Sequence, residues 1–294
     1  MKSLIQNVID ALALGSLDAL FALGIALIFG IMRLINFAHG QLIMLAAYAI
    51  ILFVGAPWPV LILGTLAVAV IAALAMERIA FRPVRGANPA TLLVTSFAIS
   101  FLVQNLAILI LGSTPRSVNV STTVTESVTI AGLDVSKLDI ITVVGTAALL
   151  TAVALFLART RIGVQMRASA EDFAMARLLG VRADAVIATA FGISGVLAGV
   201  GALLLVSQTG QVDPNIGLAP VLVAFVATVV GGMSSLVGAV LGGYLLGSLT
   251  VAMQVVLPLG VRSYRDAIVY AIVIVVLVTR PDGLIVAKSA RTRV

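Results

Sequence analysis

Nine long apolar runs constrain this chain more than any other feature of its sequence. About 20 consecutive apolar residues cross a bilayer as a helix. The runs do not alternate polar and apolar residues, as the strands of a membrane barrel would, so helices are expected. The predicted spans are roughly Val8–Phe29, Phe37–Val54, Trp58–Met76, Ala90–Leu111, Leu138–Leu157, Ala185–Val206, Leu218–Val230, Leu236–Leu257 and Ala267–Thr279.

The composition agrees with a protein whose solvent is lipid. Only 10% of the residues are charged and 61% are hydrophobic, whereas soluble domains carry about 25% charged residues. We therefore predict an all-α, polytopic integral membrane protein in which residues 1–294 form a single transmembrane domain. Because the seventh and ninth runs are short, eight or nine transmembrane helices are expected.

The residue inventory argues against several kinds of functional site. The chain has no Cys and one His, so disulfides, thiolate metal sites and clustered His metal sites are excluded. No P-loop, HExxH motif or Ser/His/Asp constellation is visible, so any ATP that drives the protein is bound by another chain. We expect no catalytic residues, no metal and no cofactor. The net charge of +6 does not indicate nucleic acid, because the distribution of basic residues among the loops explains it.

Basic residues in the connections predict the orientation of the chain, because Lys and Arg accumulate in cytoplasmic loops. If all nine runs cross, the N-terminus lies outside, the C-terminus lies in the cytoplasm, and 13 of the 18 Lys and Arg residues share the cytoplasmic side. These are Arg33, Arg78, Arg82, Arg85, Arg159, Arg161, Arg167, Arg177, Arg182, Arg280, Lys288, Arg291 and Arg293.

The connection at about 112–137 falls on the outer side and is rich in Ser, Thr and Val. Its alternating pattern predicts a small hairpin. Two interpretations stay open: a surface for an extracytoplasmic partner, or an ordered loop without a partner.

The cytoplasmic connection at about 158–184 has the pattern of an amphipathic helix. Ser169 is a candidate N-cap, and Glu171 and Asp172 suit the positive end of the helix dipole. Gly180 is a candidate left-handed C-cap. The apolar face comprises Ala170, Phe173, Ala176 and Leu179. Such a helix either lies on the lipid surface or docks into a groove on a partner protein.

A polar island interrupts the apolar sequence between the first and second spans. Arg33 fits the cytoplasmic edge of the membrane, and Asn36, His39, Gly40 and Gln41 follow it. These four residues form either a turn at that edge or a helix break that lines a polar pathway. A catalytic role for the histidine is the weakest alternative.

Other polar and small residues are further candidates. Gln104 and Asn105 in the fourth span either pair helices or contact a substrate. Gly231 and Gly232 form either a broken helix at membrane depth or a tight turn between two spans. The pairs Gly238/Gly242, Gly243/Gly247 and Gly195/Gly199 have the small-xxx-small spacing that brings helix backbones together.

Asp10 and Asp18 lie in or near the first span. A carboxylate inside a membrane is a functional candidate by default. It supports an alternative function, a stand-alone secondary transporter or channel for small polar solutes.

Several motifs resemble one family along nearly the whole chain. They are LGSLDALFALGIALIFGIMRLINFAHGQLIMLAAY, TSFAISFLVQN, RASAEDFAMARLLGV, GGMSSLVGAVLGGYLLG and RPDGL, in the order of the family. They resemble the permease subunits of bacterial ABC importers for branched-chain amino acids, of the INFAHG type.

The resemblance implies a multi-pass protein of the bacterial inner membrane that has no enzymatic site of its own. Its partners would be a second homologous permease, two cytoplasmic ATPases, an extracytoplasmic solute-binding protein and membrane lipid. Ala170, Glu171, Ala176 and Gly180 match the coupling helix that docks on the ATPase, with Asp172 among them. The substrate would be leucine, isoleucine or valine, or another amino acid, a short amide or urea.

Overall fold

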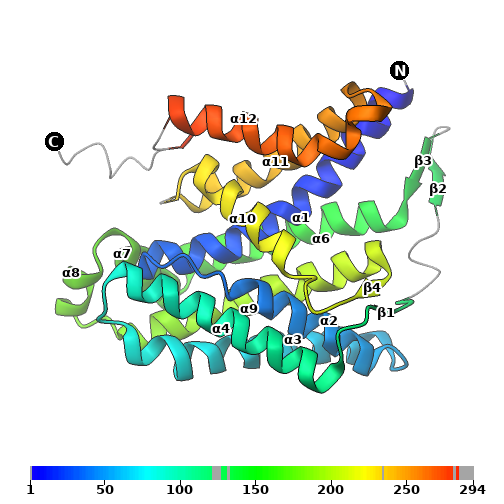
Figure 1. Cartoon of the computed structure of the whole chain (residues 1–294). Coiled ribbons are helices and arrows are strands. Elements are labelled where there is room, and N and C mark those ends of the chain that lie inside the picture. The colour runs from blue at the N-terminus through cyan, green and yellow to red at the C-terminus, as the bar shows by residue number, and fades with distance from the viewer. Residues whose placement is uncertain (1, 121–126, 131–132, 234, 281–282, 285–294) are drawn as a thin grey trace.

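The computed structural model describes residues 2–120, 127–130, 133–233, 235–280 and 283–284. Helices dominate the architecture (Figure 1), and each predicted span coincides with one α-helix. The helices are α1 (Lys2–Met32), α2 (His39–Phe53), α3 (Trp58–Met76), α4 (Pro89–Leu111), α6 (Lys137–Arg159), α7 (Arg161–Glu171), α8 (Phe173–Leu178), α9 (Ala183–Thr209), α10 (Leu218–Gly231), α11 (Leu236–Val256) and α12 (Arg265–Thr279).

The all-α, polytopic prediction is confirmed. Within the described residues, six helices are long and apolar enough to cross a membrane, namely α1, α3, α4, α6, α9 and α11. Helices α2 and α10 have 15 and 14 residues. At 1.5 Å per residue they are about 20 Å long, which is shorter than the hydrocarbon core of a bilayer.

Four short strands form two antiparallel pairs at one end of the bundle. Strands β2 (Ser127–Ile130) and β3 (Leu133–Ser136) form an antiparallel ribbon, which confirms the predicted hairpin for these residues. Strands β1 (Arg116–Ser117) and β4 (Gln211–Val212) also pair antiparallel. The second pairing was not predicted, because its strands are two residues long and come from distant connections.

The bundle has two distinct ends, which lie on opposite sides of Figure 1. The hairpin end holds β2, β3 and the start of α1. The arginine end holds α7, α8 and a cavity that Arg33, Arg82, Arg85 and Arg177 line together. Three of the four groups of basic residues that were predicted to share a side therefore meet at one end.

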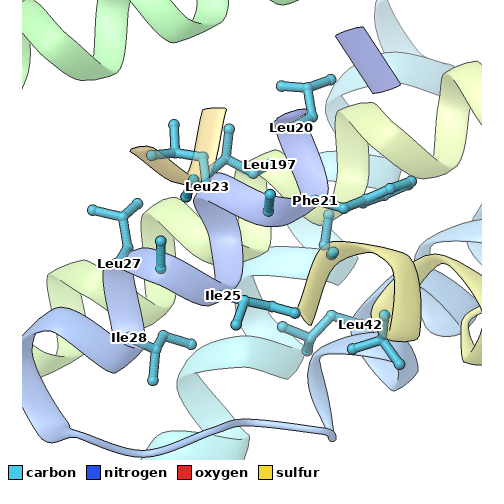
Figure 2. Close-up of a cluster of buried hydrophobic side chains, with 14 of the residues drawn as sticks. Leu20, Phe21, Leu23, Ile25, Leu27, Ile28, Leu42 and Leu197 are labelled. Carbon is cyan, nitrogen blue, oxygen red and sulfur yellow. The ribbon is translucent and has the colours of Figure 1, made fainter. Parts of the chain in front are cut away.

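Helix α1 is the centre of the bundle. It packs against α6, α7, α9, α10 and α11, and Figure 2 shows its side chains directed outward on several sides. Leu20, Phe21 and Ile28 are at most 1% exposed, and Leu42 of α2 and Leu197 of α9 are fully buried near them. A helix that is apolar all round is typical of such a central position.

Glycines allow α11 to approach its neighbours at backbone distance, as the small-xxx-small pattern predicts. A Cβ atom on Gly243 would lie 2.5 Å from the Cα of Ala19 on α1. On the same helix, Gly238 and Gly242 face the backbone of α10. Gly195 of α9 meets α3 in the same way, with the carbonyl oxygen of Ala69 at 2.9 Å from its Cβ position.

Replacing Gly243 with Val should destabilise the protein, because α1 and α11 must separate to admit the new side chain. Overpacking of this kind costs about 1–3 kcal/mol. We expect a lower midpoint of thermal unfolding for the detergent-solubilised chain. Gly145→Val on α6 is the matched control, since nothing lies within 4 Å of its Cβ position. Equal midpoints for the two variants would contradict the close packing.

Candidate functional site

Helices α2 and α10 begin beside each other in the interior of the bundle. A Cβ atom on Gly40 would lie 2.6 Å from the carbonyl oxygen of Gly217, so glycine is required for this approach. Both glycines are buried. The positive ends of two helix dipoles therefore meet at one place.

This meeting point lies at the middle depth of the bundle. Gln41, in the first turn of α2, donates from Nε2 to the Oγ of Ser100 at 2.9 Å. Ser100 is the twelfth of the 23 residues of α4, which is long enough to span the bilayer. The starts of α2 and α10 therefore lie level with the middle of α4.

A row of polar side chains on α4 follows this junction, and we name it the α4 polar row: Ser96, Ser100 and Gln104. Ser96 Oγ donates to the Ile35 carbonyl at 3.3 Å. Gln104 Nε2 donates to Asn215 Oδ1 at 2.6 Å. Ser100 and Gln104 remain partly exposed on this face.

Sequence analysis identified Gln41 and Gln104 but missed Ser96, Ser100 and Asn215. The available signal was the four-residue spacing of 96, 100 and 104, which places all three side chains on one helix face. Asn215 carried no such signal, because it lies in the irregular segment before α10.

Aromatic side chains lie next to the polar island. The ring of Phe37 stacks on that of Phe97 at 4.4 Å between centroids, and the ring of Phe225 lies at 5.5 Å. Phe97 remains 41% exposed. The face that contains the polar row therefore also offers apolar contact area.

His39 has a packing position between three helices. Its Nδ1 lies 3.0 Å from the Oγ of Ser194 on α9. A Cβ atom on Gly24 of α1 would come within 2.7 Å of its Cε1. The side chain is completely buried, so it holds α2 against α1 and α9.

Asn36 organises the chain before α2. It is 1% exposed, and its Oδ1 accepts a hydrogen bond from the Ala38 N–H at 3.1 Å. Buried backbone that is not helical needs such partners. The segment 34–38, in which Leu34, Asn36 and Ala38 are buried, therefore connects the arginine end to the mid-depth junction.

Three predicted pathway residues do not join this junction. Asn105 donates from Nδ2 to the Phe101 carbonyl of its own helix at 2.7 Å. Gly231 and Gly232 lie at the other end of α10, where Gly232 has a φ of 111°. Helices α10 and α11 pack directly on each other on either side of these glycines, which is the arrangement of a turn between two helices.

The two candidate carboxylates of α1 lie apart from the junction. Asp10 accepts a hydrogen bond from Gln6 Nε2 at 3.0 Å near the hairpin end. Asp18 is 8% exposed and lies where α1 approaches Gly243 of α11.

The connection predicted as one amphipathic helix is two helices, α7 and α8. The prediction that Ser169 is the N-cap is wrong, because Ser169 is buried within α7. Asp172 separates the helices, and its Oδ1 accepts from the Met175 N–H at 2.9 Å, so it is the cap of α8. Asp and Ser are both strong N-cap residues, so the local sequence is compatible with Asp172 as well as with the predicted Ser169.

The predicted C-cap of this connection is confirmed. Gly180 has a φ of 87°, and its N–H donates to the Arg177 carbonyl at 3.0 Å. The Val181 N–H donates to the Ala176 carbonyl at 3.1 Å. These two bonds form a Schellman motif.

The outer surface of α8 is apolar. Met175, Leu178 and Leu179 are 53%, 82% and 80% exposed, and we name them the α8 apolar surface. Of the five residues predicted to dock on an ATPase, Glu171, Asp172 and Gly180 are exposed, Ala170 is half-buried and Ala176 is buried. Ala176 therefore faces this protein's own helices.

The chain resembles known proteins over most of its length. Residues 7–277 match the family model described as branched-chain amino acid transport system / permease component. The chain is 33% identical to the high-affinity branched-chain amino acid transport system permease protein BraD of Pseudomonas aeruginosa, over 96% of this chain and 95% of BraD. It is 32% identical to the permease protein LivH of Escherichia coli K12, with the same shares covered.

His39→Ala should lower the midpoint of thermal unfolding, since it removes a buried hydrogen bond and leaves a cavity. We expect a loss of about 2 kcal/mol. Ser194 is the hydrogen-bond partner of His39. The substitution Ser194→Ala should therefore lower the stability less in the His39→Ala variant than in the unaltered protein. The control is Thr189→Ala, which lies on α9 like Ser194. The hydroxyl of Thr189 donates to the Ala185 carbonyl of its own helix. Additive shifts for His39 and Ser194 would show that they do not act as a pair.

Proposed function

The chain belongs to the family of branched-chain amino acid transport system permease components, and we propose that it forms one half of an ATP-driven translocation path. Members of this family are transport subunits and not enzymes. The observation that carries the proposal is the meeting of α2 and α10 at mid-depth beside the α4 polar row. Transporters place substrate sites where helices are interrupted at the membrane midplane.

The proposed path follows the face formed by Gln41, Ser100, Gln104 and Asn215. Gly40 permits the helix junction behind it, while Asn36 and His39 hold the surrounding turn. Asn105 and the turn at Gly231 and Gly232 support helix packing and are not proposed to touch the substrate. A second homologous permease covers this face and supplies the opposite wall.

The chemistry of the junction suits an amino acid. Two helix N-termini supply positive potential for a carboxylate, and the partly exposed ring of Phe97 supplies apolar contact for an aliphatic side chain. We propose a branched-chain or related amino acid as the substrate, as the names of BraD and LivH state for those proteins.

The arginine end is proposed to face the cytoplasm, because cytoplasmic loops collect Lys and Arg. The N-terminus and the segment at about 112–137 then lie outside, and the C-terminus lies inside. Residues 1–294 form one transmembrane permease domain with eight or nine crossings in a bacterial inner membrane.

We propose that α8 is the coupling segment that docks on a cytoplasmic ATPase. An exposed apolar helix face of this kind fits a groove on a partner protein. Asp172 and Gly180 set the two ends of the helix, and the α8 apolar surface makes the contact. ATP-driven closure of two ATPases would rock the spans and alternate access to the path. An extracytoplasmic solute-binding protein would deliver the substrate at the hairpin end.

Replacing Gln104 with Leu should slow transport by about tenfold, because loss of one polar contact in the path removes about 1–1.5 kcal/mol. The measurement is ATP-dependent uptake of labelled leucine by proteoliposomes that contain the assembled transporter. Asn105→Leu is the matched control, since its amide bonds its own helix. Equal uptake by the two variants, in complexes of equal composition, would refute the proposed path.

The double substitution Leu178→Ser and Leu179→Ser should reduce the amount of ATPase that co-purifies with the permease at least tenfold. Serine removes the apolar area that α8 offers, while Asp172 and Gly180 at the two ends of the helix stay unchanged. Leu52→Ser is the control, because Leu52 is 76% exposed on α2, away from the arginine end. Undiminished co-purification with the double variant would exclude α8 as the docking segment.

A further inference from the structure

A basic cavity of about 480 Å³ lies at the arginine end of the bundle. Three segments that are distant in sequence form it: the end of α1, the segment after α3, and helix α8 with the start of α9. Four arginines and one carboxylate supply its charged groups: Arg33, Arg82, Arg85, Arg177 and Asp184.

Two of the arginines are held in place by ion pairs. Asp184 accepts from Arg82 Nη2 and from Arg85 Nη1, each at 2.5 Å. Arg85 also pairs with Glu77, which is buried. These two arginines are therefore balanced by two carboxylates, and the network gives that wall of the cavity a defined position.

The other two arginines have no such balance. In the part of the chain that the structure describes, neither Arg33 nor Arg177 forms an ion pair with a carboxylate. The guanidinium of Arg33 lies 5.9 Å from the ring of Phe29. Among the described residues, the two carboxylates near this cavity, Asp184 and Glu77, are thus paired with Arg82 and Arg85 and not with Arg33 or Arg177.

The backbone at Arg33 is unusual. Its φ is 52°, and every other residue with positive φ in the described ranges is a glycine. The left-handed region is unfavourable for a residue with a Cβ atom. The chain nevertheless keeps an arginine at this position, directly after the last turn of α1.

Apolar side chains line the same cavity beside the arginines. Ile31 and Ile187 belong to the two spans that end or begin there, and Phe173 belongs to α8. A ligand that is complementary to both the arginines and these apolar side chains carries an anionic group next to a hydrocarbon chain. The cavity lies where two predicted spans end, and the phospholipids of the bilayer are molecules of this kind.

We infer that this cavity binds the phosphate-bearing headgroup of an anionic phospholipid, with Arg33 and Arg177 as its principal ligands. Arginine pairs with phosphate oxygens through two parallel N–H donors. Basic pockets between membrane helices bind anionic headgroups in this way. The inference does not depend on the proposed transport function, since binding is measured without transport.

The location of the cavity gives the lipid a structural consequence. Arg177 and Phe173 belong to α8, whereas Arg33 follows α1, the central helix of the bundle. A headgroup that contacts both arginines would link the proposed docking segment to the core. The lipid composition of the membrane would then influence how firmly α8 is held.

The test is native mass spectrometry of the full-length chain in detergent, titrated with phosphatidylglycerol or with phosphatidylcholine of the same acyl chains. We expect one phosphatidylglycerol to bind at least tenfold more tightly than phosphatidylcholine. Arg33→Gln with Arg177→Gln should weaken phosphatidylglycerol binding by about 30-fold, at roughly 1 kcal/mol for each arginine near the surface. Arg78→Gln with Arg161→Gln removes the same charge from exposed positions outside the cavity and should have no effect.

Three results would overturn the inference. Equal losses in both double variants would show nonspecific attraction to a basic surface. Inorganic phosphate that competes for the site at micromolar concentration would identify a soluble phosphate compound, and not a lipid, as the ligand. If the Arg33 and Arg177 variant binds phosphatidylglycerol normally but loses the co-purifying ATPase, the arginines belong to a protein interface.

Discussion

The rest of the structure depends on the burial of α1 within protein and not within lipid. The hydrophobic effect does not drive one apolar helix against another in a bilayer, because lipid is equally apolar. Close backbone contact supplies the attraction instead, as at Gly243, where α11 meets Ala19. Five helices pack on α1, so the positions of the polar junction and of the α7–α8 connection are set relative to this helix.

The mid-depth junction follows from the need to satisfy polar groups away from water. Helices α2 and α10 are by themselves shorter than the hydrocarbon core of a bilayer, so each begins inside the protein. Backbone of this kind is tolerated at membrane depth only where protein or a water-filled cavity surrounds it. Asn36, Ser96 and Ser100 supply hydrogen-bond partners there. In the proposed transport function, the same groups would form the polar surface that the substrate follows.

Much of the fold could be predicted, since all nine apolar runs became helices and members of three of the four basic groups meet at one end. The connection 158–184 shows where prediction stopped. Its Gly180 cap was readable because left-handed backbone favours glycine. The N-cap was predicted wrongly at Ser169, because this residue is buried within α7, which packs on α1 and α9, and Asp172 is the cap of α8. Burial of Ala176 and exposure of Leu178 likewise depend on how α8 is packed and not on the local pattern.

The sequence by itself determined the solvent of this protein, its helical class and the end at which its arginines gather, because run length and charge are local properties. Its motifs also indicated the family. Only the tertiary structure decided that Gln41 meets Ser100, that His39 packs on Ser194 and that Arg33 shares a cavity with Arg177. The reason is that a helix face in contact with lipid and a helix face in contact with another helix are both apolar, so their residue composition does not distinguish them. Contacts between distant segments therefore emerge only when the backbones are packed together.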